Sequence, residues 1–172
     1  MTQALHLNLC IPPDWKRIEL VRKAVGFCVW AAFGRGDLRD SVAMVSAELL
    51  ENAVKYSTPS SEVAISIWEE SDRVVVAVTN TVAEESPHIA SLKRRLDWAH
   101  GFPSPAEAYM AALSEVFDQN GGVPSGQGGL GLVRIAYEGG CSIDCDSATD
   151  GKVTVRAFRA IAGDAAPTSG TG

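Results

Sequence analysis

The sequence predicts an α+β fold, a two-layer sandwich in which helices cover a mixed, mostly antiparallel sheet. Two patterns carry this prediction. Residues with the two-residue alternation of half-buried strands occur within 5–11, 63–78 and 142–158. Residues with a helical period occur within 14–33 and 37–57, and again after a Gly-rich stretch that ends near residue 131. Helices and paired strands segregated in this way are typical of a layered α+β sandwich.

The first strand is marked by apolar residues at every second position: Leu5, Leu7, Leu9 and Ile11. Two prolines end it, and Asp14 is expected to cap the helix that follows. The apolar face of that helix recurs at three- or four-residue steps: Ile18, Val21, Val25 and Val29. The sequence Gly-Arg-Gly-Asp at 34–37 breaks the helix, and Asp37 is expected to cap the next one.

The helix expected over 37–57 carries two rows of side chains. One row is apolar: Val42, Val45, Leu49, Ala53 and Tyr56. The other consists of Glu48, Asn52 and Lys55, which stand at i, i+4 and i+7 and therefore share a stripe. Periodicity alone favours a solvated charged face with a Glu-Lys ladder over a binding row, because charged helix faces are usually just solvated.

The remaining elements follow from turn residues and alternation. Val63, Ile65 and Ile67 alternate, Ser71-Asp72 makes a turn, and a β-branched run at 74–78 completes a hairpin in the middle of the sheet. Residues 81–128 form a helical insertion with two short helices. Two closing strands within 142–145 and 153–158 follow the last helix, and residues 162–172 are a small, polar tail expected to be disordered.

Composition limits the function. A chain of 172 residues forms one domain, and its net charge of −6 argues against a nucleic-acid or anionic-membrane surface. The longest apolar runs fall short of the ~20 residues that span a bilayer. The four cysteines lack CxxC spacing and are expected to be reduced and mostly buried: Cys10, Cys28, Cys141 and Cys145. With no signal peptide recognised, the expected location is the cytoplasm.

The Gly-rich stretch, Gly-Gln-Gly-Gly-Leu-Gly-Leu at 126–132, precedes a helix. Unhindered backbone N–H groups there suit phosphate oxygens. The spacing of Gly126, Gly128 and Gly131 also fits the dinucleotide fingerprint. That fingerprint requires a strand directly before it, whereas here a helical segment with a proline precedes it, so the Rossmann interpretation is rejected.

These two motifs together carry a resemblance. Glu-x-x-x-Asn-Ala-x-Lys-Tyr-Ser at 48–57 resembles the N-box of the GHKL ATPases, and Gly-Gly-Leu-Gly-Leu at 128–132 resembles their G2 box. The resemblance implies the Bergerat (histidine-kinase-like ATPase) fold over residues 1–161, with 81–128 as the ATP lid. It implies ATP and Mg²⁺ as cofactors, with Asn52 as the metal ligand, Glu48 as the general base and Lys55 near the phosphates. The phosphate loop would comprise Gly126, Gly128, Gly129, Leu130 and Gly131.

One box departs from the family pattern. Where most GHKL proteins have Asp-x-Gly-x-Gly after the central strand, this chain has Asn80 in the Asp position and lacks both glycines. A carboxamide oxygen can still accept a hydrogen bond from the adenine amino group, but without charge, so weaker adenine affinity is expected. Val82 stands at a family glycine position, where the backbone can approach the adenine base closely. The Gly-Thr pair that the family has near the end of the domain is also altered, because Gly151 is followed by Lys152, with Thr154 two residues on.

An Asn in this position, a helical lid and Gly-Gly-x-Gly-Leu together resemble the SiaB-like branch of bacterial anti-sigma-factor serine kinases. That resemblance implies a partner-switching kinase that phosphorylates a Ser or Thr on a small STAS-like antagonist, with a downstream regulator as a further partner. Related kinases pair, so a homodimer is also an expectation. The alternative is an interaction module that kept the fold and lost nucleotide, which the changes at Asn80 and Val82 favour.

Overall fold

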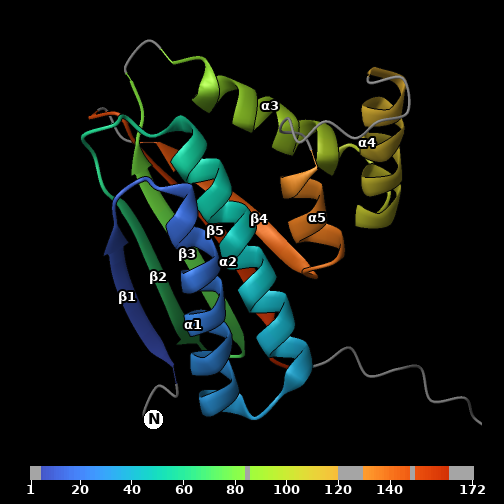
Figure 1. The fold of residues 1–172 in the computed structure, drawn as a ribbon. Coiled ribbons are helices and arrows are strands. Elements are labelled where there is room, and N and C mark those ends of the chain that lie inside the picture. The colour runs from blue at the N-terminus through green and yellow to red at the C-terminus, as the bar shows by residue number, and fades with distance from the viewer. Residues whose placement is uncertain (1–4, 84–85, 120–129, 148–149, 163–172) are drawn as a thin grey trace, which may run out of the picture.

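The computed structural model describes residues 5–83, 86–119, 130–147 and 150–162. Within these residues, five helices and five strands follow one another in the expected order (Figure 1). The elements are β1 (His6–Ile11), α1 (Trp15–Phe33), α2 (Gly36–Tyr56), β2 (Val63–Glu70), β3 (Arg73–Thr81), α3 (His88–His100), α4 (Pro105–Gln119), α5 (Gly131–Tyr137), β4 (Cys141–Ser147) and β5 (Lys152–Ala160). The predicted two-layer α+β sandwich is confirmed.

The five strands form one sheet in the order β1-β2-β3-β5-β4. Each neighbouring pair of described strands is antiparallel, so the sheet has no parallel pair where a mixed one was expected. The reason is that β1 and β2 also run in opposite directions, although two helices separate them along the chain. The predicted hairpin of β2 and β3 turns at Ser71-Asp72 and lies in the middle of the sheet.

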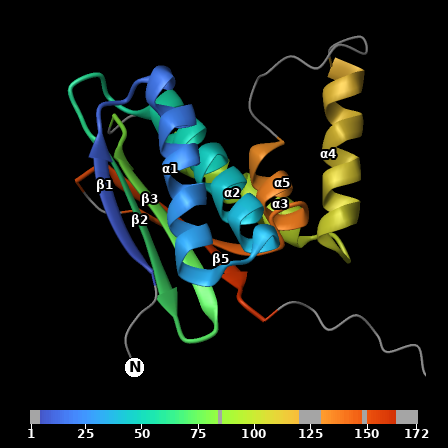
Figure 2. The same cartoon turned by 60° about the horizontal axis from the view of Figure 1, so that its bottom comes forward.

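The helices α1 and α2 cover one face of this sheet (Figures 1 and 2). Ile65 and Ile67 of β2 pair with Val78 and Val76 of β3, respectively. Because side chains alternate along a strand and paired residues share a face, these four side chains lie on one face of the sheet. These four side chains are at most 2% exposed. They pack in one core with Val45 and Leu49 and with Val25 and Val29, which α2 and α1 supply.

The N-terminal cap predicted from the sequence is found for α1 but not for α2. Asp14 caps α1 as expected, and its carboxylate accepts from the backbone N–H of Lys16 at 3.0 Å. Asp37 does not cap α2, because that helix already begins at Gly36. Asp37 instead lies in the first turn, where its carboxylate is held by the guanidinium of Arg35. An acidic residue in the first turn still suits the helix dipole, and the predicted cap differs from the observed one, Arg35, by two positions.

The helices α3, α4 and α5 form a smaller group beside α2 and the sheet. Figures 1 and 2 show α4 on the outer side of α5, away from the sheet. A separate apolar cluster joins α4 to α5 through Ala108, Ala112 and Val133, with Trp98, Phe102 and Tyr109 packed against it. These aromatic side chains therefore pack within the molecule. Residues 120–128 of the predicted lid and 163–172 of the predicted tail lie outside the described residues.

All four cysteines are free, as expected, but Cys141 alone is buried and Cys10 is exposed on the edge strand β1. The expectation of mostly buried thiols is therefore wrong for Cys10, because the sequence pattern did not reveal that β1 is an edge strand. Among the helices of the described residues, none combines the length and the hydropathy that a membrane crossing requires.

Candidate functional site

The predicted polar row lies on α2 along the flank that faces α5. Glu48 is partly buried, with 16% of its side chain exposed, whereas Lys55 is exposed near the end of the helix. Asn52 is half-buried between them, and its carboxamide has no hydrogen-bond partner within the described parts of the chain. A polar side chain that the fold leaves unpaired in this place is available to a ligand.

The helix α5 meets α2 at Glu48. A Cβ atom added at Gly131, the first residue of α5, would stand 2.9 Å from Oε2 of Glu48, so the glycine permits a close approach. Arg134, one turn further, donates from Nη1 to Oε1 of Glu48 at 2.7 Å across a sequence separation of 86 residues. The fold thus brings the segments that resemble the N-box and the G2 box into contact.

Arg134 belongs to a network that the sequence analysis missed. Its Nε donates to Oε2 of Glu138 at 2.7 Å, and the Tyr109 hydroxyl of α4 donates to Oε1 of the same carboxylate at 3.0 Å. The Arg134 guanidinium holds the pKa of Glu138 below its usual range, and the hydrogen bond to Glu138 raises the pKa of Tyr109. The spacing of Arg134 and Glu138, four residues apart on one helix, is the one sequence signal that pointed here.

Asn80, at the end of β3, is buried and faces α2. Its Nδ2 donates to the backbone carbonyl of Ala53 at 3.3 Å, which gives the carboxamide NH₂ the partner that a buried donor needs. The Oδ1 atom then remains as an acceptor, the role that the resemblance assigns to it.

Thr154 occupies a different face of the sheet. Val153 is the residue that pairs with Asn80, and the next residue, Thr154, pairs with Thr79. Successive side chains of a strand point to opposite faces, so Thr154 points away from α2. Its hydroxyl is hydrogen-bonded to that of Thr79 at 2.8 Å. Thr154 therefore does not lie beside Asn80, Asn52 or Glu48.

An aromatic stack closes the far end of the polar row. The rings of Tyr56 and His88 lie parallel, with centroids 3.5 Å apart, and Lys55 places its ammonium 5.2 Å from the Tyr56 ring. His88 is 6% exposed. Burial, and then the nearby charge of Lys55, lowers the pKa of His88 to about 4. The imidazole is therefore neutral at physiological pH, and Lys55 is the cation at this end of the row.

The phosphate loop predicted from the sequence is only partly described. Gly126, Gly128 and Gly129 lie outside the described residues. Leu130 is half-buried against the apolar cluster between α4 and α5, and Gly131 begins α5 beside Glu48. The part of the loop that the structure describes is thus anchored next to the polar row.

The donor set suits magnesium only together with a phosphate ligand. No group of three or more His, Cys, Asp or Glu side chains within the described residues is arranged to hold a metal ion. Mg²⁺ is commonly bound through one or two protein oxygens plus phosphates and water, so the unpaired carboxamide of Asn52 fits such a site.

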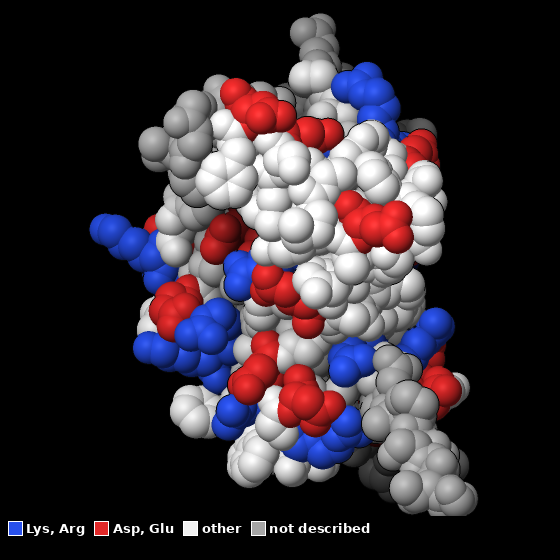
Figure 3. Space-filling view, turned by 90° about the vertical axis from the view of Figure 1, so that its right-hand side faces the viewer, with Lys and Arg blue, Asp and Glu red and all other residues white. Residues whose placement is uncertain are grey.

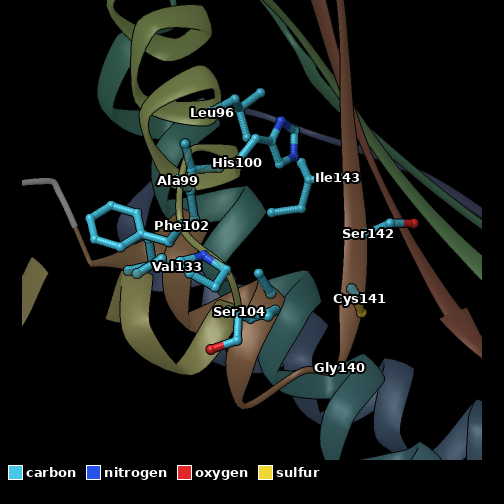
Figure 4. A pocket seen from close by; sticks show the side chains of 15 residues that line it. Leu96, Ala99, His100, Phe102, Ser104, Val133, Gly140, Cys141, Ser142 and Ile143 are labelled. Atoms are coloured by element: carbon cyan, nitrogen blue, oxygen red, sulfur yellow. The ribbon is translucent and has the colours of Figure 1, made fainter. Parts of the chain in front are cut away.

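A cavity of about 500 Å³ lies elsewhere, between the end of α3, α5 and β4 (Figure 4). Its walls include Leu96, Phe102, Val133 and Ile143, with His100 at one side. The α5 residues that line it, Leu132, Val133 and Ala136, are on the side of that helix opposite Gly131 and Arg134. None of the predicted site residues that the structure describes lines this cavity, so it is distinct from the polar row.

The surface beside α4 and α5 carries charges of both signs. Figure 3 shows acidic and basic side chains interspersed on this side, around an uncharged area. Exposed apolar residues of the two helices include Met110, Phe117 and Tyr137. This side of the described structure is not the continuous basic surface that a nucleic-acid backbone attracts.

No protein-family model matches the chain, and no curated protein matches it. Among solved structures, it is similar to a chain in the crystal structure of the SiaB–SiaC complex from Pseudomonas aeruginosa. The two chains share 21% sequence identity over 88% of each, with a TM-score of 0.68. At this level of identity the likeness shows a common fold.

Proposed function

We propose that this protein binds ATP with Mg²⁺ and phosphorylates a Ser or Thr of a small regulatory partner. The observation that supports the proposal best is the contact between Glu48 of α2 and Gly131 of α5. Glu48 belongs to the first sequence motif and Gly131 to the second, so their close approach supports a shared site.

The residues would divide the work as follows. Asn52 would hold Mg²⁺ through its side-chain oxygen, and the ion would supply charge neutralisation at the phosphates. Glu48 would orient and deprotonate the acceptor hydroxyl, and Lys55 would add a positive charge near the phosphates. Asn80 would accept a hydrogen bond from the adenine amino group, because its NH₂ is already engaged by Ala53.

The partner is inferred from the fold. A chain with this fold occurs in the two-protein SiaB–SiaC complex. We infer a protein partner for this chain as well, namely a small STAS-like antagonist in the cytoplasm. The phosphorylation state of that antagonist would decide whether it binds a downstream regulator.

Nucleotide binding is tested by thermal unfolding with and without Mg-ATP. A ligand at ~100 times its dissociation constant stabilises a protein by about 2.7 kcal/mol, which for this length raises the Tm by about 5–11 °C. We expect this shift to require Mg²⁺ and to vanish in Asn52→Ala. The matched control is Asn8→Ala on the exposed edge strand, which should keep the shift. No shift in the wild type at millimolar Mg-ATP would refute nucleotide binding.

Phosphotransfer is tested with purified STAS-like proteins as acceptors, taken from the organism that encodes this chain. Removing a general base typically costs 10²- to 10⁴-fold in rate, so Glu48→Gln should abolish measurable transfer. Asp40→Asn is the matched control, because Asp40 is an exposed carboxylate of the same helix, away from Glu48 and Arg134. Equal rates in the two variants would exclude Glu48 as the base.

A second candidate function is an interaction module without nucleotide. Three features favour it. The guanidinium of Arg134 is hydrogen-bonded to the carboxylate of Glu48, and His88 stacks on Tyr56 at the end of the row. The glycines that the family has after the position of Asn80 are also absent. This candidate predicts that Asn52→Ala binds the partner as the wild type does, with and without Mg-ATP. Calorimetric titration of the two proteins distinguishes it from the kinase, whose partner affinity should depend on nucleotide.

A further inference from the structure

Arg134 connects the lid helix to the proposed base through an unbroken chain of hydrogen bonds. Tyr109 of α4 donates to Oε1 of Glu138, and Oε2 of Glu138 accepts from Nε of Arg134. The other end of the guanidinium donates from Nη1 to Oε1 of Glu48. The three distances are 3.0, 2.7 and 2.7 Å, so each is an ordinary or strong hydrogen bond.

The contact restrains the carboxylate that the proposed reaction needs. Oε1 of Glu48 is occupied by the guanidinium, and Oε2 lies against Gly131. A general base must offer a lone pair to the acceptor hydroxyl within hydrogen-bond reach. The guanidinium takes one lone pair of Oε1 and fixes the orientation of the carboxylate, so Glu48 can turn freely toward an acceptor hydroxyl only when Arg134 leaves.

The pair is less exposed to solvent than a typical surface ion pair, but one partner remains open to water. Glu48 exposes 16% of its side chain and Arg134 exposes 44%. Water and salt therefore screen the interaction only in part. Such a contact holds the carboxylate in the resting structure, yet a ligand or a movement of α5 can displace it.

The outer end of this series of hydrogen bonds, Tyr109, lies on a different helix from Arg134 and Glu138. Tyr109 belongs to α4, which packs on the outer side of α5 through the cluster of Ala108, Ala112 and Val133 (Figure 2). A displacement of α4 breaks the Tyr109 bond and leaves Glu138, the carboxylate that holds Arg134 on α5, with one fewer constraint.

We propose that Arg134 is a positioning residue that keeps Glu48 engaged, and that the lid helix α4 controls this restraint through Tyr109 and Glu138. The proposal rests on the kinase function proposed above. In such a kinase the base turns more freely toward the acceptor hydroxyl when α4 no longer holds Arg134, so the rate of phosphotransfer depends on the position of the lid helix.

The first test compares phosphotransfer rates. Tyr109→Phe removes only the outer hydrogen bond, so we expect a rise of about two- to five-fold; Arg134→Gln removes the restraint itself, and we expect about five- to ten-fold. Arg134→Lys keeps the positive charge and should return the rate towards that of the wild type. The matched controls are Tyr137→Phe on the exposed side of α5 and Arg39→Gln at the surface of α2; both should leave the rate unchanged.

The direction of change separates this role from others. A residue that only stabilises the fold lowers the rate when it is replaced, and so does an arginine that binds the phosphates. Unchanged or lower rates in both Tyr109→Phe and Arg134→Gln, with an active wild type, would overturn the restraint and leave the kinase function standing.

The second test does not depend on activity. Glu48→Gln, Arg134→Gln and the double variant form a cycle in urea unfolding, and we expect their effects on the unfolding equilibrium to be non-additive by up to about five-fold. Additive effects would show that the two side chains do not interact and would overturn the inference. Coupled effects with no phosphotransfer and no Mg-ATP shift in any variant would refute the kinase function, and the proposed regulation with it.

Discussion

The close packing of α5 against α2 gives the sharpest stability prediction, through Gly139. A Cβ added at Gly139 would lie 2.4 Å from the carbonyl oxygen of Ile135 and 2.8 Å from Cγ2 of Val45. Carbon and carbonyl oxygen atoms in contact are about 3.3 Å apart, so Gly139→Ala must displace the end of α5 by about 0.9 Å. Ile135 and Val45 are buried in the main core, so neither can yield freely.

Overpacking of this kind typically costs about 1–3 kcal/mol. For a cost of about 2 kcal/mol in a chain of this length, the Tm of Gly139→Ala should fall by about 4–8 °C. Calorimetric or circular-dichroism melting measures the change. Because Ser41 donates to the carbonyl of Gly139 at 2.7 Å, the variant should also loosen the joint between the two helices.

The control is Gly36→Ala at the start of α2. No atom lies within 4 Å of a Cβ added there, so this variant should be neutral or slightly more stable than the wild type. A Gly139→Ala protein as stable as Gly36→Ala would refute the packing argument, since it would show that α5 does not sit as closely on α2 as the structure has it.

Two further predictions concern buried polar groups. Burial, and then the charge of Lys55, lowers the pKa of His88 from 6.5 for a free imidazole to about 4 in the fold. As the pH falls, the unfolded chain therefore binds the proton before the folded chain does. The free energy of unfolding should fall by up to about 3 kcal/mol as the pH drops from 6.5 to 4. Urea titrations at pH 7 and pH 5 should show a smaller loss in His88→Phe, and an equal loss would contradict this cause. Asn80→Asp places a carboxylate against the carbonyl of Ala53 and removes the donor, so it should cost about 1–3 kcal/mol at pH 7 by urea unfolding; wild-type stability would disprove the hydrogen bond.

The sequence by itself determined the elements and the composition of the polar row. Glu48, Asn52 and Lys55 share a stripe because of the helical repeat, which is a local property that no tertiary contact is needed to define. The alternation of Ile65 and Ile67 with polar or small residues likewise fixed which side chains of β2 face the core. Those predictions depended only on the geometry of a single helix or strand.

The tertiary structure alone decided which faces meet. Arg134 reaches Glu48 across 86 residues, and Asn80 donates to Ala53 at the end of α2, because the sheet register and the docking of α5 bring these elements together. Strand register also turned Thr154 away from Asn80, since a shift of one residue moves a side chain to the opposite face. Periodicity describes the faces of one element, whereas the partner of each face follows from packing between elements that lie far apart in the sequence.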